Sequence, residues 1–189
     1  DFTYYNGPVQ KRRELRLLEQ IGAGMACLDF DLDGRVDFYL GQASCEPPDG
    51  RGGRPNLLSR SLGDRFVTVT GAANCDDRGC SCGVTSGDWN QDGFPDLVVA
   101  NLARNTLLIN QGDGTFIAHR GSPIWNQSYN TTSLAMGDVN GDQLPDIVEV
   151  NYVDDPSVYD PIQYKPDGTP VHWPAPSDYR PCADRLFLS

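Results

Sequence analysis

This sequence has no long apolar run, few histidines and fewer basic than acidic residues. No apolar run in the 189 residues approaches the roughly 18 residues that cross a bilayer, so we expect no membrane span. The chain has 15 basic and 26 acidic residues and a formal charge of −11, whereas nucleic-acid-binding domains present a basic face. We therefore expect no nucleic-acid partner.

Catalytic signatures are scarce as well. The two histidines leave few groups that titrate near neutral pH, and there is no His-Glu-x-x-His sequence. The segment GVTSG at residues 83–87 is not a Gly-x-Ser-x-Gly elbow. Asp154 and Asp155 are the remaining candidates for paired-carboxylate chemistry, although an exposed acidic loop is the favoured interpretation. We expect a protein that is not an enzyme.

Six cysteines stand at positions 27, 45, 75, 80, 82 and 182. This even number favours an oxidising compartment with some disulfides, and hence an extracytoplasmic protein that is secreted, periplasmic or at the cell surface. A zinc site is the alternative, but Cys80-Ser-Cys82 lacks a second pair at the usual spacing. The pairing of the cysteines stays open.

An acidic pattern occurs three times, and we name its copies loops one, two and three. They are DFDLDGRVD at residues 29–37, DWNQDGFPD at residues 88–96 and DVNGDQLPD at residues 138–146. Each loop precedes a strand-forming apolar run, and a second short run follows from Asn56, Asn105 and Asp184. Glycine-rich turns then lead into runs from Phe66 and Phe116, which the residues from Phe2 match in form.

Units of about four short strands at this spacing are typical of propeller blades. We expect an all-β fold, a β-propeller of four-stranded blades with about three present. The repeats would be residues 1–65, 66–115 and 116–189, with a long insertion at 151–183. A propeller needs about four to eight blades, so we expect a partial ring that is completed by more of the same chain or by another chain. Residues 11–20, KRRELRLLEQ, are the segment with helix-forming character, and a solvated connection is favoured there.

The three loops, the segments GAGMA, GVTSG and SLAMG ahead of them, and the Asn-rich runs behind them resemble FG-GAP/VCBS repeats. These are the calcium-loop blades of integrin α-subunit propellers. The set also resembles bacterial proteins that pair such repeats with an ASPIC/UnbV segment. The resemblance implies a calcium-binding module with a structural, adhesive or protein-binding role. The alternative is a non-catalytic accessory domain of a larger extracytoplasmic enzyme, one that binds carbohydrate or another substrate.

Calcium takes six to eight oxygen ligands, and alternate residues of a tight acidic loop can converge on one ion. We therefore predict up to three Ca²⁺ sites. The predicted ligands are the side chains at loop positions one, three, five and nine and the carbonyl at position seven: Asp29, Asp31, Asp33, Asp37 and Arg35; Asp88, Asn90, Asp92, Asp96 and Phe94; Asp138, Asn140, Asp142, Asp146 and Leu144. Purely polar turns are the alternative, which three copies at one spacing disfavour.

An EF-hand begins with the same pattern, but it needs an acid at position twelve and an exiting helix. Position twelve is Leu40 after loop one and Val99 after loop two, and an acid, Glu149, only after loop three. The residues that follow are strand-forming, so we exclude the EF-hand.

Two features predict a ranking of the sites. Loop one has four carboxylates and should bind calcium most tightly, in a structural rather than a sensing role. In loop three Gln143 replaces the glycine at position six, which should strain or redirect the turn and weaken the site.

The insertion is rich in aromatic residues, namely Tyr152, Tyr159, Tyr164, Trp173 and Tyr179. These side chains could stack on sugars or anchor a protein partner. A lid over one face of the propeller, tethered through Cys182, is the favoured interpretation, because a loop of this length needs burial to stay ordered. The expected partners are a protein or the remaining blades, with carbohydrate as a further candidate.

Overall fold

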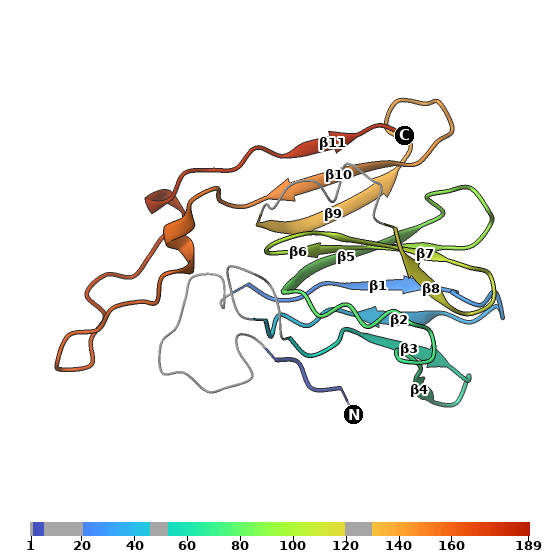
Figure 1. The fold of residues 1–189 in the computed structure, drawn as a ribbon, viewed down its shortest axis with the longest axis horizontal. Helices are drawn as coiled ribbons and strands as arrows, with labels where there is room; N and C mark the ends of the chain where they lie inside the picture. Colours follow the sequence, from blue (N-terminus) through green and yellow to red (C-terminus); the bar gives the residue numbers. More distant parts are fainter. Residues whose placement is uncertain (1, 6–20, 46–52, 120–129) are drawn as a thin grey trace.

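The protein is described by a computed structural model that covers residues 2–5, 21–45, 53–119 and 130–189. The helix-forming segment at residues 11–20 lies outside these ranges. Three antiparallel sheets lie side by side along the described chain (Figure 1). The described residues contain no α-helix, only two short 3₁₀ turns, η3 (Pro156–Tyr159) and η4 (Pro176–Asp178). The predicted all-β fold of partial propeller blades is confirmed.

Each sheet follows the chain from its first strand outward. The first sheet contains β1 (Met25–Leu28), β2 (Asp37–Leu40), β3 (Leu57–Ser61) and β4 (Phe66–Thr68). The second contains β5 (Ser81–Gly87), β6 (Asp96–Asn101), β7 (Thr106–Asn110) and β8 (Phe116–Ala118). The third contains β9 (Thr131–Gly137), β10 (Asp146–Asn151) and β11 (Arg185–Phe187).

The strands that begin with phenylalanine lie at the outer edges of these sheets. Strand β4 pairs with β3, and β8 pairs with β7, so each closes the sheet that precedes it in the chain. Residues 2–5 form no strand, so the expected match between the residues from Phe2 and these edge strands is wrong over that range. The repeat boundaries at residues 65 and 115 stay a prediction. These boundaries fall just before β4 and β8, whereas the second and third hydrogen-bonded sheets begin one strand further on, at β5 and β9.

The first strands of neighbouring sheets approach each other closely at glycine. A Cβ at Gly24, just before β1, would lie 2.8 Å from the Cα of Gly83 in β5. A Cβ at Gly83 would in turn lie 2.9 Å from the carbonyl oxygen of Thr132 in β9. Real Cβ atoms do not approach backbone atoms this closely, so glycine permits the spacing between the sheets. The glycines ahead of the acidic loops thus have a packing role.

Buried side-chain hydrogen bonds connect each sheet to the next. The amide of Asn56 donates to the hydroxyl of Ser81 at 2.8 Å, and that hydroxyl donates to Asn101 at 3.0 Å. The same relay joins the second and third sheets through Asn105, Thr131 and Asn151, with distances of 3.1 and 2.8 Å. Buried polar groups need such partners, so the relay fixes which sheets are neighbours.

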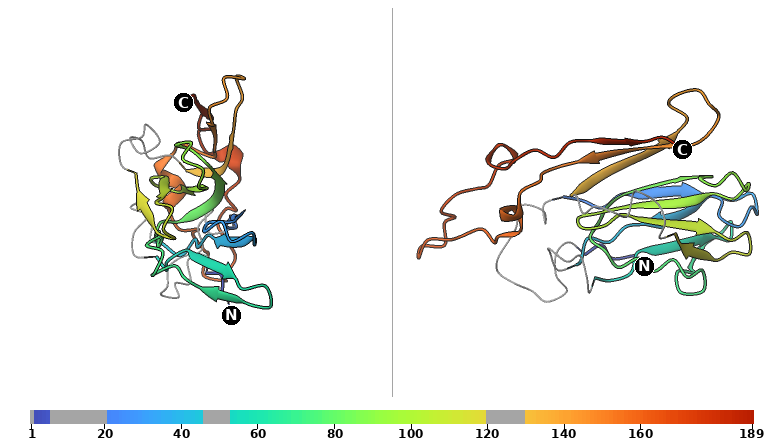
Figure 2. Two further views of the ribbon diagram at one scale, coloured as in Figure 1. Left: turned by 90° about the vertical axis from the view of Figure 1, so that its right-hand side faces the viewer. Right: turned by 45° about the horizontal axis from the view of Figure 1, so that its top comes forward.

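The insertion leaves the third sheet at the end opposite the acidic loops (Figures 1 and 2). Val158 is fully buried in a cluster with Leu102 and the disulfide between Cys45 and Cys80. Tyr152, Tyr159 and Tyr179 pack against this cluster, as a lid would.

Two parts of the lid prediction differ from the structure. The thiol of Cys182 is free, so the tether is wrong, and hydrogen bonds of the Tyr159 hydroxyl to Leu102 and Asn130 hold the segment instead. In Figure 2 the insertion extends away from the sheets as an arm. Its residues Tyr164 and Trp173 are exposed. The expectation of some disulfides is confirmed by the bridge between Cys45 and Cys80.

Candidate metal centre

The three acidic loops occupy one position in the fold. Each connects the first strand of its sheet to the second, and all three lie at the same end of the stacked sheets (Figure 1). Their internal geometry also repeats, position by position. The loops can therefore be compared as three copies of one structure.

The aspartate at position one organises each loop. The carboxylate of Asp29 accepts the backbone amides of Asp33 at 3.0 Å and Gly34 at 2.8 Å. Asp88 and Asp138 accept the amides at the same positions of their loops, with distances from 2.8 to 3.2 Å. The backbone thus folds around the first carboxylate.

Position five caps the amide of position seven. Asp33, Asp92 and Asp142 accept the amides of Arg35, Phe94 and Leu144 at 2.9 to 3.0 Å. The role of the carbonyls of these last three residues as calcium ligands stays a prediction. In loops two and three the position-three side chains, Asn90 and Asn140, accept the amide of position five and donate to its carboxylate.

The aspartate at position nine is completely buried in all three loops. Asp37, Asp96 and Asp146 are each 0% exposed. One carboxylate oxygen of each accepts the amide at position two of its own loop, and the other accepts an amide from the segment of its sheet's third strand: Ser61, Asn110 and Ser189. An ionised carboxylate has about four acceptor positions, so each can still bind a cation.

Two positions in each loop adopt left-handed backbone conformations. At position six, Gln143 has φ of 70°, close to the 83° of Gly34 and the 92° of Gly93, and its amide reaches Asp138 at 2.9 Å. The replacement of glycine therefore leaves the path of the turn unchanged, contrary to that part of the prediction. At position four, loop three has Gly141, whereas the other loops place Leu32 and Gln91 at positive φ.

Loop one differs from the others in its charges. Oxygen atoms of Asp29, Asp31 and Asp37 lie within 4.8 Å of one another, an arrangement that could hold a metal ion. The guanidinium of Arg60 in β3 lies 2.6 Å from Asp31 and 3.0 Å from Asp33, and Arg35 lies 2.9 Å from Asp33. Asp31 Oδ1 is buried and has no hydrogen-bond partner among the described residues.

The carboxylates of the loops differ in acidity. Burial raises the pKa of Asp37, and the nearby Asp31 and Asp33 raise it further. Burial likewise raises the pKa of Asp96 to about 6. The pKa of Asp138 is lowered, because the amide of Gln143 and other loop amides donate to it. A cation bound in either loop would favour the ionised form of its buried aspartate, Asp37 or Asp96.

The structure thus brings predicted ligands together most clearly in loop one. The donor set of carboxylate and amide oxygens suits calcium, and the unpartnered Oδ1 of Asp31 is the kind of atom that a cation would satisfy. Sequence reasoning missed Arg60. The available signal was the aspartate at position three, where loops two and three have asparagine.

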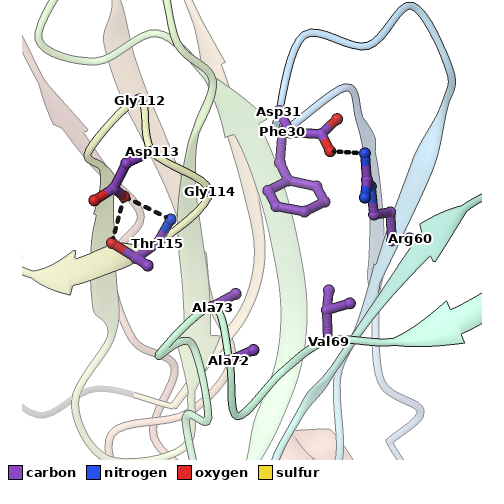
Figure 3. A pocket seen from close by; sticks show the side chains of 10 residues that line it. All are labelled: Phe30, Asp31, Arg60, Val69, Ala72, Ala73, Gly112, Asp113, Gly114 and Thr115. Carbon is purple, nitrogen blue, oxygen red and sulfur yellow. Dashed lines mark hydrogen bonds and ion pairs between the residues drawn. The ribbon is translucent and has the colours of Figure 1, made fainter.

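A hollow of about 490 Å³ lies beside loop one, between the first and second sheets (Figure 3). Asp31 and Arg60 line one side of it, and Asp113, which accepts two hydrogen bonds from Thr115, lines the other. Its floor is apolar and includes Val69.

One serine fits a catalytic spacing that the sequence analysis did not consider. Residues 79–83 read Gly-Cys-Ser-Cys-Gly, which is the Gly-x-Ser-x-Gly spacing. Ser81 is 0% exposed, begins a strand and makes hydrogen bonds to Asn56 and Asn101. A nucleophile would need an exposed hydroxyl at a strand-to-helix turn, so this serine is structural.

The repeated loops also match a known protein family. A sequence profile described as FG-GAP-like repeat matches residues 29–99 and again residues 88–149, which together span more than half of the chain. Each match begins at the first aspartate of an acidic loop. No curated protein matches the chain significantly.

Proposed function

The chain belongs to the FG-GAP-like repeat family, and we propose that it is a calcium-binding β-propeller module in which calcium stabilises the blades. Its role is structural, adhesive or protein-binding, at the cell surface or in secreted form. The disulfide between Cys45 and Cys80 supports an oxidising location. Among the described residues, no helix is both long and apolar enough to span a membrane.

The repeated geometry of the loops carries this proposal. In all three, the first aspartate binds backbone amides, the fifth caps position seven, and the ninth joins the loop to its sheet's third strand segment. Polar turns without a ligand would not need three or four carboxylates at one tip, since like charges repel there. The charges are the feature that the turn geometry leaves unexplained.

Calcium would be held by the side chains at positions one, three, five and nine and by the carbonyl at position seven. When bound, it would supply positive charge to the carboxylates. The chain's own contribution is to place Asp37, Asp96 and Asp146 where each also holds two backbone amides. Through these residues, stabilisation of a loop would extend to the sheet.

Thermal unfolding with calcium and with a chelator tests the proposal. We expect calcium at about 100 times its dissociation constant to raise the free energy of unfolding by about 2.7 kcal/mol per site. Magnesium at the same concentration is the control, and it should have a smaller effect because it demands a stricter octahedral geometry. An unchanged melting temperature, together with no heat of calcium binding in calorimetry, would contradict the proposal.

The arm of the insertion favours a second candidate function. Trp173 is 57% exposed and Val171 58%, and Tyr164 lies on the same arm. Exposed aromatic rings can stack on sugars, which suits an accessory domain that binds carbohydrate for a larger extracytoplasmic enzyme. A glycan-binding screen with Trp173→Ala as the control would distinguish this role, because the substitution lies far from the loops and should leave calcium binding intact.

A further inference from the structure

We propose that Arg60 is an internal cation that occupies the carboxylates of loop one, so that calcium must displace it and fills this loop last. The inference rests on the proposed calcium-binding function and reverses the ranking predicted from the number of carboxylates. It assigns to a residue of β3 the control of affinity at a loop far from it in sequence.

The contacts of Arg60 place its charge at the carboxylates that calcium would use. One guanidinium nitrogen lies 2.6 Å from Asp31 Oδ2 and 3.0 Å from Asp33 Oδ2. The side chains of Asp31 and Asp33 are 19% and 18% exposed and that of Arg60 is 36% exposed, so these pairs are partly shielded from water. Ion pairs that are shielded from water are stronger than pairs on the open surface. Arg35 also pairs with Asp33, but its own side chain is 49% exposed and its contribution is screened.

The other two sheets have an uncharged residue at the strand position of Arg60. Counting from the asparagine or aspartate that precedes each third strand, Arg60 corresponds to Ile109 and Leu188. Loops two and three accordingly have an asparagine at position three, not an aspartate. The extra carboxylate and the arginine at this strand position therefore occur together. If the exposed Arg35 is set aside, Arg60 offsets the charge of the one carboxylate that loop one has beyond the three of loops two and three.

The hollow beside loop one gives the displaced guanidinium a place to move. Arg60 lines this hollow of about 490 Å³, and its Nε is buried without a hydrogen-bond partner among the described residues (Figure 3). Asp113 lines the opposite wall, where its carboxylate accepts hydrogen bonds from Thr115 (Figure 3). Displacement therefore does not require the sheets to separate.

The substitution Arg60→Ile, which copies the second sheet, tests the inference by calcium calorimetry. We expect the weakest of the three sites to bind about tenfold more tightly, which corresponds to the loss of one competing ion pair. Arg65→Gln is the matched control, since it removes a nearby positive charge that pairs only with the exposed Asp64 among the described residues. It should leave all three constants unchanged.

Two further measurements keep the test independent of folding. The double variant Asp31→Asn with Arg60→Ile reproduces loop two at both positions, and we expect its affinity at loop one to match that of loop two. In the wild type, the Arg60 Nε–H resonance in the ¹H–¹⁵N spectrum, assigned by its loss in Arg60→Ile, should shift only as the last calcium binds.

The outcomes separate this inference from the proposed function. If calcium binds but Arg60→Ile leaves every constant unchanged, or if the Arg60 resonance shifts with the first calcium, the inference is wrong and the calcium function stands. If neither the wild type nor any variant binds calcium, the proposed function fails and the inference fails with it.

Discussion

The second and third sheets are built from matching strands, yet they solve the same packing problem with different chemistry. In the second sheet, Val99 of β6 pairs across the strands with Thr106 of β7, and every residue of β6 is buried. In the third sheet the equivalent pair is Glu149 and Arg185. Glu149 is 1% exposed, lies 3.1 Å from Arg185 and accepts hydrogen bonds from Asn105 and Thr131.

The difference shows that the repeat requires a backbone arrangement and not a particular core composition. Both sheets keep the buried aspartate at position nine and the relay of polar side chains at the other end. Between these fixed ends, the pair of Val99 and Thr106 and the buried ion pair of Glu149 and Arg185 are alternatives. A buried ion pair contributes little net stability, but it is costly to break.

Glu149→Val should have the largest effect. It deprives Arg185 and Asn105 of their buried carboxylate, and we expect a loss of about 3–5 kcal/mol in the free energy of unfolding. The double variant Glu149→Val with Arg185→Thr installs the pair of the second sheet and should recover most of this loss. Urea denaturation measures both. If the double variant is as unstable as the single one, the two pairs are not interchangeable.

Gly83→Ala should have the next largest effect, because its Cβ would lie 3.1 Å from the Cα of Ser133 as well as against Thr132. We expect a loss of about 1–3 kcal/mol, as is typical when atoms are added to a packed contact. Ser133 occupies the same position in the third sheet and is exposed, so Ser133→Ala is the control and should change stability little. Thermal melts of both variants check the difference, and equal effects would contradict the packing role of Gly83.

Exchanging position six between loops two and three should have a smaller effect. A side chain in the left-handed conformation costs about 1 kcal/mol relative to glycine. Gly93→Gln should therefore lower the free energy of unfolding by about this amount, while Gln143→Gly should raise it slightly, since glycine also gains entropy in the unfolded chain. Chemical denaturation in the presence of chelator measures the change without calcium, and opposite signs are expected.

The smallest expected effect is that of Asp77→Asn, which changes the carboxylate bound by the asparagine at the end of β6. Asn101 donates to the carbonyl of Arg104, as Asn151 does to that of Ala183, but Asn101 also donates to the carboxylate of Asp77. Burial raises the pKa of Asp77, although the hydrogen bonds from Asn101 and Thr106 oppose the rise.

A carboxyl group whose pKa is higher in the folded state contributes stability below its unfolded pKa of about 3.9 and loses that contribution as the pH rises through the folded pKa. The free energy of unfolding of the wild type should therefore fall relative to that of Asp77→Asn as the pH increases from about 4 toward 7. Denaturation curves at several pH values in chelator measure this difference. A difference that stays constant or grows with pH would contradict the raised pKa.

Local patterns were enough to predict the loops and most of the strands. Apolar runs after Asp37, Asp96 and Asp146 became β2, β6 and β10, because a short apolar run between turns has few alternatives to a strand. The left-handed glycines Gly34 and Gly93 also followed from the loop pattern.

Contacts between distant segments could not be predicted. Arg60 meets Asp31, and Glu149 meets Asn105, only because neighbouring strands or sheets place them together. The disulfide partner of Cys45 depends on the fold in the same way. The exposed arm was missed for a different reason, since nothing in the order of Tyr159, Tyr164 and Trp173 indicates which of them finds a surface to cover.

The buried aspartate at position nine has a consequence for how such repeats would change over evolutionary time. Asp37, Asp96 and Asp146 each hold two backbone amides regardless of any cation. Without calcium, the carboxylate that loop one has at position three could be replaced by the asparagine of the other loops, whereas loss of the ninth would leave buried amides without acceptors. The ninth aspartate would then be retained for its backbone hydrogen bonds alone, in a loop that no longer binds a metal.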